Sequence, residues 1–330
     1  MSKKSEKKRR NWGALPDRLP YPIIDTHAHI DMISNWVENI NKDNFLKNRE
    51  PITNPTLSQI TNCSADANIV RFIQCACDIN GINSLSDVLD TIQDNQADDA
   101  NLPEAIGAAA IHPNEAALHD GFADPSPDGL IPKKLDLHKS IPLDAAIGEV
   151  ENAIKLDKRV QVVGETGLDY FRTAESGRPS QIKSFREHIK LAKDYNLALQ
   201  IHDRLAHFDI MDILQKDKAP ERVIFHSFSG DEEMAKLCTK NGWFLSFSGP
   251  VTYKANEDAR KALLAADSNF LLLETDCPFL TPEPVRGGPN APAYTAYTAQ
   301  FISELLNLEL EQFCRLVYNN TLKALGKSAL

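Results

Sequence analysis

The sequence lacks the features that identify membrane and secreted proteins. Its 330 residues contain no run of about 18 consecutive apolar side chains, which excludes an ordinary membrane-spanning helix. No apolar segment follows the charged N-terminus, so we expect no signal peptide. The six cysteines form no Cys-x-x-Cys pair and no regular ladder, which favours reduced thiols. These absences predict a cytoplasmic protein without a membrane partner.

Positive charge is also scarce, and it is unevenly distributed. The formal net charge is −10, but residues 1–10 carry a net +5, so the rest of the chain carries −15. We interpret residues 1–20 as a disordered basic tail without a dedicated role, and residues 21–330 as one domain. So acidic a domain is poorly suited to wrapping long duplex DNA. A nucleic-acid substrate would therefore be held locally, and nothing indicates an obligate protein partner.

Eight apolar segments of strand-forming composition recur along the chain. Several are continuous rather than alternating, which is typical of parallel strands buried on both faces. Helix-like amphipathic segments separate them, at 180–195, 205–217, 231–240 and 254–266, and two more follow at 294–307 and 309–325. The predicted strands are 22–28, 68–77, 105–111, 160–165, 197–202, 222–226, 243–248 and 269–275. This alternation predicts an α/β fold, a single-domain (β/α)8 TIM-type barrel, with an open doubly wound sheet as the alternative.

Two segments do not fit the simple repeat. Residues 31–55 and 119–141 are rich in Asn, Asp and Pro, and they follow the first and third predicted strands. We interpret both as insertions in the loops at the C-terminal face of the barrel, where barrel enzymes place their active sites.

Histidines and carboxylates follow several predicted strands. His27 and His29 end the first strand, and residues two apart on a strand point to the same side, so both imidazoles can reach one ion. Similar positions after later strands are held by Glu165, His202, His226 and Asp276. Four imidazoles and two carboxylates suit one or two divalent ions. Two ions would leave positive charge for an anionic substrate, which favours a phosphate ester over a neutral amide.

Five sequence blocks, in order, resemble those of the TatD family of metal-dependent deoxyribonucleases, over about residues 22–325. The blocks are Asp25-Thr26-His27-Ala28-His29, Gly164-Glu165-Thr166-Gly167-Leu168-Asp169-Tyr170, Ile201-His202-Asp203-Arg204, His226-Ser227-Phe228-Ser229-Gly230 and Glu274-Thr275-Asp276-Cys277-Pro278. The resemblance implies a barrel hydrolase whose six metal ligands are His27, His29, Glu165, His202, His226 and Asp276. It also implies two divalent ions bridged by Glu165, with Mg²⁺ or Mn²⁺ functional and Zn²⁺ possible. Glu165 and Asp276 are the implied catalytic residues, and single-stranded DNA or its 3′ ends the implied substrate.

The same resemblance points to supporting residues and to departures. His112 would face the substrate, and Arg172 and Arg204 would hold a phosphate. The loop 286–292 lacks two basic residues and one acidic residue that the family usually has, and Leu205 replaces a residue that is usually acidic.

The remaining histidines are expected outside the metal site. His119, His138 and His188 should be solvated, and His207 should have a structural role.

Two other functions are compatible with these residues. An amidohydrolase acting on a small ester or amide would share the barrel and the His-x-His pair, but its binuclear members often bridge their metals with a lysine where Glu165 stands. A scaffold without catalytic activity is the third possibility, and the complete ligand set disfavours it.

Overall fold

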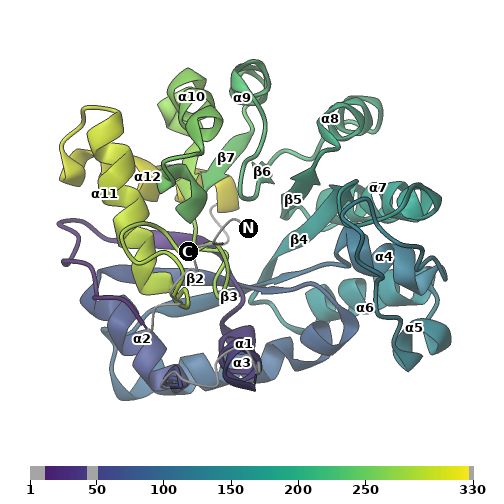
Figure 1. Ribbon diagram of the computed structural model, residues 1–330, viewed down its shortest axis with the longest axis horizontal. Helices are drawn as coiled ribbons and strands as arrows, with labels where there is room; N and C mark the ends of the chain where they lie inside the picture. Colours follow the sequence, from purple (N-terminus) through teal and green to yellow (C-terminus); the bar gives the residue numbers. More distant parts are fainter. Residues whose placement is uncertain (1–11, 43–50, 327–330) are drawn as a thin grey trace, which may run out of the picture.

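The computed structural model describes residues 12–42 and 51–326, and it contains one eight-stranded parallel sheet (Figure 1). Its strands neighbour one another in sequence order, as in a barrel. The strands are β1 (Ile23–Ala28), β2 (Ile69–Ala76), β3 (Glu104–Ala109), β4 (Val160–Asp169), β5 (Ala198–Arg204), β6 (Val223–Phe225), β7 (Phe244–Phe247) and β8 (Leu271–Leu273). The eight predicted strands and the predicted barrel are confirmed, and the open doubly wound sheet is excluded.

The barrel closes between β1 and the segment that follows β8. Ala28 and Cys277 form a parallel bridge, and the His29 amide donates to the Cys277 carbonyl at 2.8 Å. Asp25 is fully buried and accepts hydrogen bonds from the amide and the hydroxyl of Thr275, at 2.9 and 2.5 Å. This closure brings the two ends of the sheet, with His27 and Asp276, to one side of the molecule.

The apolar side chains of β8 divide between two cores. On β8, Leu271 and Leu273 contact the helices, whereas Leu272 belongs to a separate cluster with Ile73 and Val162. Both faces of these strands are buried, which explains why their sequences are continuous apolar runs. Leu325, near the end of α12 (Leu310–Leu325), packs into the second cluster.

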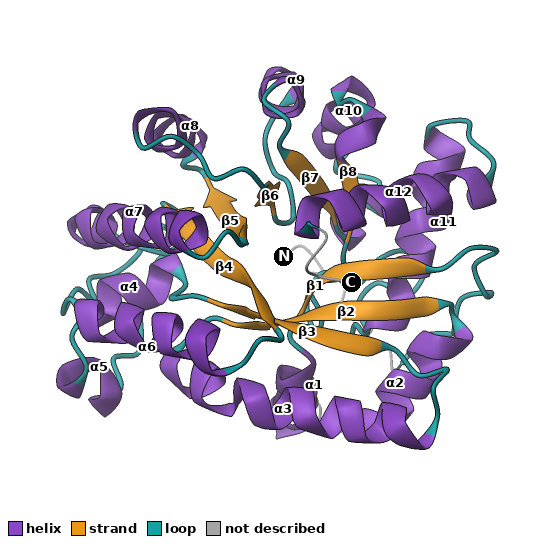
Figure 2. Ribbon diagram, turned by 180° about the vertical axis from the view of Figure 1, so that it is seen from behind, coloured by secondary structure: helices purple, strands orange, loops and turns teal. Residues whose placement is uncertain are grey.

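Helices surround the sheet on its outer side (Figures 1 and 2). Besides α12 they are α1 (Ile30–Lys42), α2 (Leu57–Asp66), α3 (Ile79–Asp98), α4 (Pro113–His119), α5 (Asp136–Ser140), α6 (Leu143–Leu156), α7 (Arg178–Asp194), α8 (His207–Lys216), α9 (Glu232–Lys240), α10 (Glu257–Ala265) and α11 (Thr295–Leu305). The six helices predicted from the sequence are present. The segment predicted as an insertion at 31–55 contains most of α1, and the one at 119–141 contains α5. Among the described helices, none has the length and apolar character needed to cross a bilayer.

The predicted N-terminal tail falls into two parts. Residues 1–11 lie outside the described residues. Residues 12–20 pack against the barrel: Leu19 is buried, and its amide donates to the Ala67 carbonyl. The hydroxyls of Tyr294 and Tyr297 donate to the carbonyls of Gly13 and Ala14. The folded unit therefore includes residues before the predicted boundary at 21, because Leu19 supplies an apolar anchor.

Candidate metal centre

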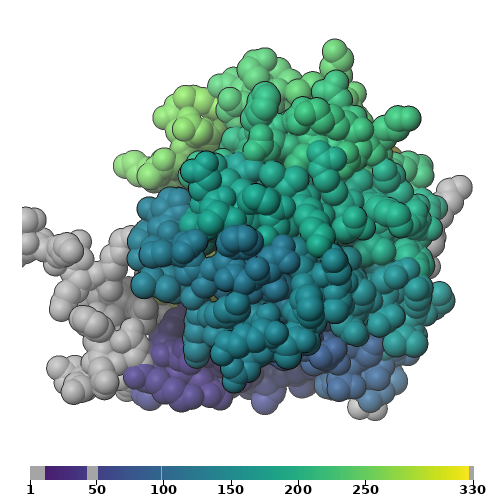
Figure 3. Space-filling view, turned by 90° about the vertical axis from the view of Figure 1, so that its right-hand side faces the viewer, coloured from purple at the N-terminus to yellow at the C-terminus, as the bar shows by residue number. Residues whose placement is uncertain are grey.

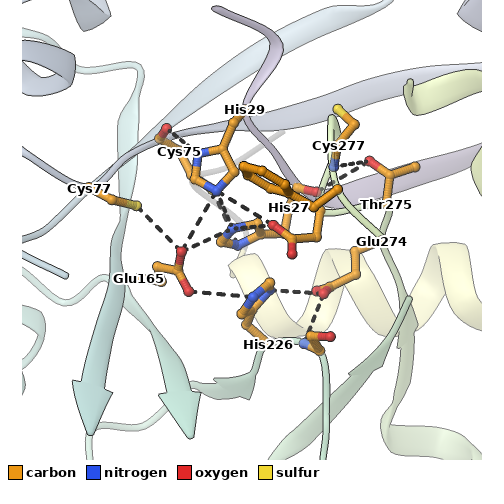
Figure 4. Close-up of polar contacts among 12 residues, drawn as sticks. His27, His29, Cys75, Cys77, Glu165, His226, Glu274, Thr275 and Cys277 are labelled. Atoms are coloured by element: carbon orange, nitrogen blue, oxygen red, sulfur yellow. Dashed lines mark hydrogen bonds and ion pairs between the residues drawn. The ribbon is translucent and has the colours of Figure 1, made fainter. Parts of the chain in front are cut away.

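The six predicted metal ligands come together at the C-terminal end of the barrel. Figure 4 shows His27, His29, Glu165 and His226 among them. Three groups of side chains place their donor atoms within 4.8 Å of one another: His27, His29 and Glu165; His27, His226 and Asp276; and His112, Glu165 and His202. These residues come from or directly follow β1, β3, β4, β5, β6 and β8. Strands that are far apart in the sequence thus build one site, as expected for a barrel enzyme.

The Nε2 atoms of His27 and His29 point toward each other. The Nδ1 of His27 lies 2.9 Å from the Gln200 Oε1, and the Nδ1 of His29 lies 3.1 Å from the Cys75 carbonyl oxygen. Because both partners are acceptors, the ring protons belong on Nδ1, and each Nε2 keeps its lone pair. The two Nε2 atoms are only 3.1 Å apart. Two converging lone pairs repel each other, and a cation between them would relieve that repulsion.

Carboxylates complete this half of the site. The Glu165 Oε1 lies 3.7 Å from the Nε2 of both His27 and His29, and the Asp276 Oδ1 lies 3.8 and 3.6 Å from the same nitrogens. Burial raises the pKa of Asp276 to about 7, against the opposing influence of His226 and His29. The donor set, with its electron pairs and negative charges directed at one place, therefore fits a divalent cation.

Glu165 is shared between two groups of histidines. Its Oε2 lies 3.0 Å from Nδ1 of His202, 3.4 Å from Nε2 of His226 and 4.0 Å from Nε2 of His112. Glu165 was predicted to end its strand, and that prediction is wrong, because β4 continues to Asp169. Between Val163 and Thr166, two residues of β4 oppose one residue of β5, and such a bulge redirects the side chain within it.

His202 lies between two carboxylates. Its Nδ1 faces Glu165 and its Nε2 lies 3.2 Å from the Asp169 Oδ2. Burial disfavours the charged ring, but the bonds to Asp169 and Glu165 outweigh it and raise the pKa of His202 to about 9. The backbone of β5 at His202 approaches β4 closely, since a Cβ on Gly167 would lie 2.1 Å from the His202 carbonyl oxygen, and Gly167 has a φ of +142°. Glycine is required at this position.

His226 is held by a second carboxylate behind it. Its Nδ1 lies 2.8 Å from the Oε1 of Glu274, which is fully buried (Figure 4). Burial opposes protonation, but the charges of Glu274 and Glu165 raise the pKa of His226 to about 10. A carboxylate in this position orients a histidine ligand and increases its basicity.

The three residues predicted to contact substrate have different surroundings. Nδ1 of His112 accepts the Asn114 amide proton at 3.1 Å, and the ring stands edge-on to His202, so His112 lies within the ligand cluster. Arg172 is paired with Asp128, 2.9 Å from Nε to Oδ2. Arg204 is exposed and stacks on the Phe171 ring at 4.3 Å. Of the two arginines, Arg204 is the one without an ion pair among the described residues, although the charge of Asp128 also attracts it.

A cleft of about 500 Å³ opens beside the ligand cluster. Its lining includes His202, His226 and Asp276 from the cluster, together with Arg204 and Ser229. The nearby loop 286–292, which differs from the family pattern, has structural contacts here. Asn290 is buried and donates to the carbonyls of Thr275 and Phe279, on both sides of Asp276.

Three histidines expected in solvent are in fact buried, so that prediction is wrong. His188 accepts the Ile111 amide proton on Nε2 and faces the Ser184 carbonyl with Nδ1, which joins α7 to the end of β3. His119 and His138 contact each other at the ends of α4 and α5. His207 pairs with Asp203 at 2.8 Å and does not belong to the ligand cluster.

Sequence reasoning missed the residues that hold the ligands. Gln200 holds His27, Asp169 holds His202, and Glu274 holds His226. Gln200 and Glu274 stand two positions before a predicted ligand, and on a strand that spacing puts two side chains on the same face. The two-residue period of a strand was therefore the signal that could have identified Gln200 and Glu274. Asp169 follows Glu165 by four residues and was predicted to lie beyond the strand.

The chain is similar to several known proteins. A family model, TatD related DNase, matches residues 24–326. The uncharacterized metal-dependent hydrolase TatD of Mycobacterium tuberculosis is 39% identical over 187 residues, which cover 56% of this chain and 70% of that protein. The uncharacterized metal-dependent hydrolase YabD of Bacillus subtilis is 41% identical over 165 residues, 49% of this chain and 64% of its own. The crystal structure of a TatD homologue from Escherichia coli superimposes with a TM-score of 0.67 at 22% identity, covering 92% and 97% of the two chains.

Proposed function

The chain belongs to the family of TatD-related DNases, which makes it a metal-dependent hydrolase, and from that premise we propose that it cleaves phosphodiester bonds in DNA. We propose further that it acts as a 3′-5′ exonuclease on single-stranded DNA or 3′ ends. The observation that carries the proposal is the position of Glu165, whose two oxygens face different groups of histidines.

Such a shared carboxylate supports the binding of two divalent ions, with Mg²⁺ or Mn²⁺ in function and Zn²⁺ possible. His27, His29 and Asp276 would hold one, His202 and His226 the other, and Glu165 would bridge them. When bound, divalent ions lower the pKa of water and stabilise the attacking and leaving oxygens of a phosphate ester. To bind one, His202 must release a proton, because both of its nitrogens now face carboxylates.

The protein's own side chains would orient the reaction. Asp276 stands at the edge of the cleft, where its carboxylate can orient a water molecule and accept its proton. Arg204 lines the same cleft and would hold a phosphate by charge-assisted hydrogen bonds. His112 faces Glu165 with Nε2, so it would act next to the bridging carboxylate.

The amidohydrolase alternative differs in the residue expected at the bridging position, which is often a lysine in its binuclear members and is Glu165 in this chain. Glu165 and Asp276 together leave positive charge over when two divalent ions bind. That surplus suits a phosphodiester, which carries a negative charge, better than a neutral ester or amide.

The test is cleavage of 3′-labelled single-stranded DNA by metal-free protein, with and without Mg²⁺ or Mn²⁺, beside the Asp276→Asn variant. We expect metal-dependent shortening from the labelled end by the wild-type protein alone. Equal cleavage by the variant would mean that the activity comes from elsewhere. Metal binding without cleavage would refute the nuclease, and hydrolysis of small esters or amides would then support the alternative.

A further inference from the structure

A second cluster of side chains that could hold a metal ion lies in the connection between β3 and β4. Figure 3 shows the face of the molecule that carries this connection, the face on which α4 and α7 lie in Figure 1. Glu115 and His119 are four residues apart on α4 and therefore share one helix face. His138, on α5, meets them from the other end of the segment 119–141. One donor atom from each of the three residues lies within 4.8 Å of the other two.

The cluster of Glu115, His119 and His138 is largely buried, unlike a group of exposed polar side chains on the surface. His119 and His138 are only 5% and 3% exposed, and their rings stand edge-on with centroids 4.8 Å apart. Nε2 of His138 lies 2.8 Å from Oε2 of Glu115. The Glu115 side chain is 26% exposed, so one side of the cluster is open to solvent.

His119 has an electron pair without a partner among the described residues. Its Nδ1 lies 2.7 Å from the Ile141 carbonyl oxygen, which can only accept, so the proton is on Nδ1. The opposite nitrogen, Nε2, is buried, and no described residue forms a hydrogen bond with it. Burial lowers the pKa of His119, which keeps the ring neutral and this lone pair available. A buried polar atom without a partner requires an explanation, and a bound ion is one.

We propose that Glu115, His119 and His138 form a second metal site of the zinc class, which fastens the segment 119–141 to α4. Two imidazoles and one carboxylate are typical zinc ligands, and the open side at Glu115 allows water as the fourth. The site shares no residue with the cluster around Glu165. It does not depend on the proposed DNase activity.

Binding has one identifiable cost. The Leu135 amide now donates to Nδ1 of His138 at 2.9 Å, so the ring proton is on Nε2. Coordination through Nε2 requires that proton to move to Nδ1, and the Leu135 amide must then turn to another acceptor. The start of α5 therefore rearranges when the ion binds, while the contact between His119 and Ile141 remains.

The experiment counts zinc ions in the full chain. Wild-type protein, His119→Gln and Glu115→Gln are stripped with a chelator, dialysed against dilute Zn²⁺ and analysed by mass spectrometry for bound metal. His207→Gln and Glu149→Gln are matched controls outside both clusters. We expect each of the two site variants to hold about one equivalent less than the wild type, and the controls to hold the wild-type amount.

Hydrogen exchange over residues 113–141 gives a second measurement. Zn²⁺ should slow exchange there in the wild type and in the controls, but not in His119→Gln or Glu115→Gln. Equal zinc content in all variants would overturn the proposal, because zinc would then bind only at the barrel mouth. If circular dichroism shows that His119→Gln does not fold, Glu115→Gln decides, since the Glu115 side chain is partly exposed and glutamine has nearly the same shape.

Discussion

Glu274 holds His226 from behind: its Oε1 lies 2.8 Å from Nδ1 of His226 and also accepts the Ser227 amide proton at 2.8 Å. This contact fixes the ring so that Nε2 faces Glu165. The carboxylate is fully buried and does not itself reach the cleft lining. We therefore expect Glu274 to position His226, one of the predicted metal ligands.

Glu274→Gln should weaken metal binding without unfolding the protein. The amide keeps an oxygen for the Ser227 amide but removes the charge that favours His226 as a donor. Loss of such a partner typically lowers metal affinity by about 10- to 100-fold. Competition with a chelating dye measures the affinity, and Glu233→Gln on the exposed side of α9 is the control. An unchanged affinity would show that Glu274 only fills space.

Asp276→Asn should abolish most of the turnover. A neutral amide cannot accept a proton from water, and losing a general base typically costs about 10²- to 10⁴-fold in rate. The measurement is kcat on labelled DNA, with circular dichroism to verify folding. Asp212→Asn, on the exposed face of α8, should keep full activity. Wild-type kcat in Asp276→Asn would remove this residue from the mechanism.

Arg204 and Arg172 should differ in their effect on substrate binding. Arg204 lines the cleft, stacks on Phe171 and forms no ion pair with the described residues, so its guanidinium is available to a phosphate. Arg204→Ala should raise KM for DNA on the order of tenfold, the value of one charge-assisted hydrogen bond. The measurement is KM against salt concentration. A KM equal to that of the wild type would make Arg204 structural.

Arg172→Ala should raise KM less than Arg204→Ala does, because Asp128 already neutralises Arg172. In the converse variant, Asp128→Asn, the guanidinium of Arg172 loses its ion pair and becomes available to the substrate. This variant should therefore lower KM. Both variants are compared with the wild type under the same salt conditions. If Arg172→Ala has the larger effect, the pair with Asp128 must open when substrate binds.

Asp157 should stabilise the protein fully above about pH 4 and progressively less below it. The hydrogen bond from Arg159, together with the Arg159 amide and Ser86, lowers the pKa of Asp157 from 3.8 to about 2. A carboxyl whose pKa is lowered by folding stabilises above its unfolded pKa, and the gain is lost as pH falls from about 4 to 2. After allowance for solvent screening, the contribution is about 1 kcal/mol.

Urea unfolding of Asp157→Asn measures this contribution. The variant should be less stable than the wild type at pH 7, and the difference should narrow at pH 3. Asp258→Asn, with an exposed carboxyl, should show almost no difference at either pH. If the difference in the free energy of unfolding between the wild type and Asp157→Asn is the same at pH 3 as at pH 7, Asp157 acts through packing or neutral hydrogen bonds.

The sequence alone predicted the strands and the six residues that the structure brings together as candidate metal ligands. Continuous apolar runs are local, and they predicted β1 to β8 because strands buried on both faces need apolar residues throughout. His27, His226 and Asp276 were found for the same reason, since each lies at or just beyond the C-terminal end of its apolar run. The bulge that places Glu165 inside β4 was not predictable, because it depends on the register with β5.

Only the tertiary structure decided what surrounds these residues. Arg172 meets Asp128 and His27 meets Gln200 across gaps in sequence that no periodicity spans. The burial of His119 and His138 was missed because α4 and α5 are 7 and 5 residues long, too short to show a helical pattern. Periodicity shows which face of an element is covered, but the identity of a contacting side chain depends on how separate elements pack.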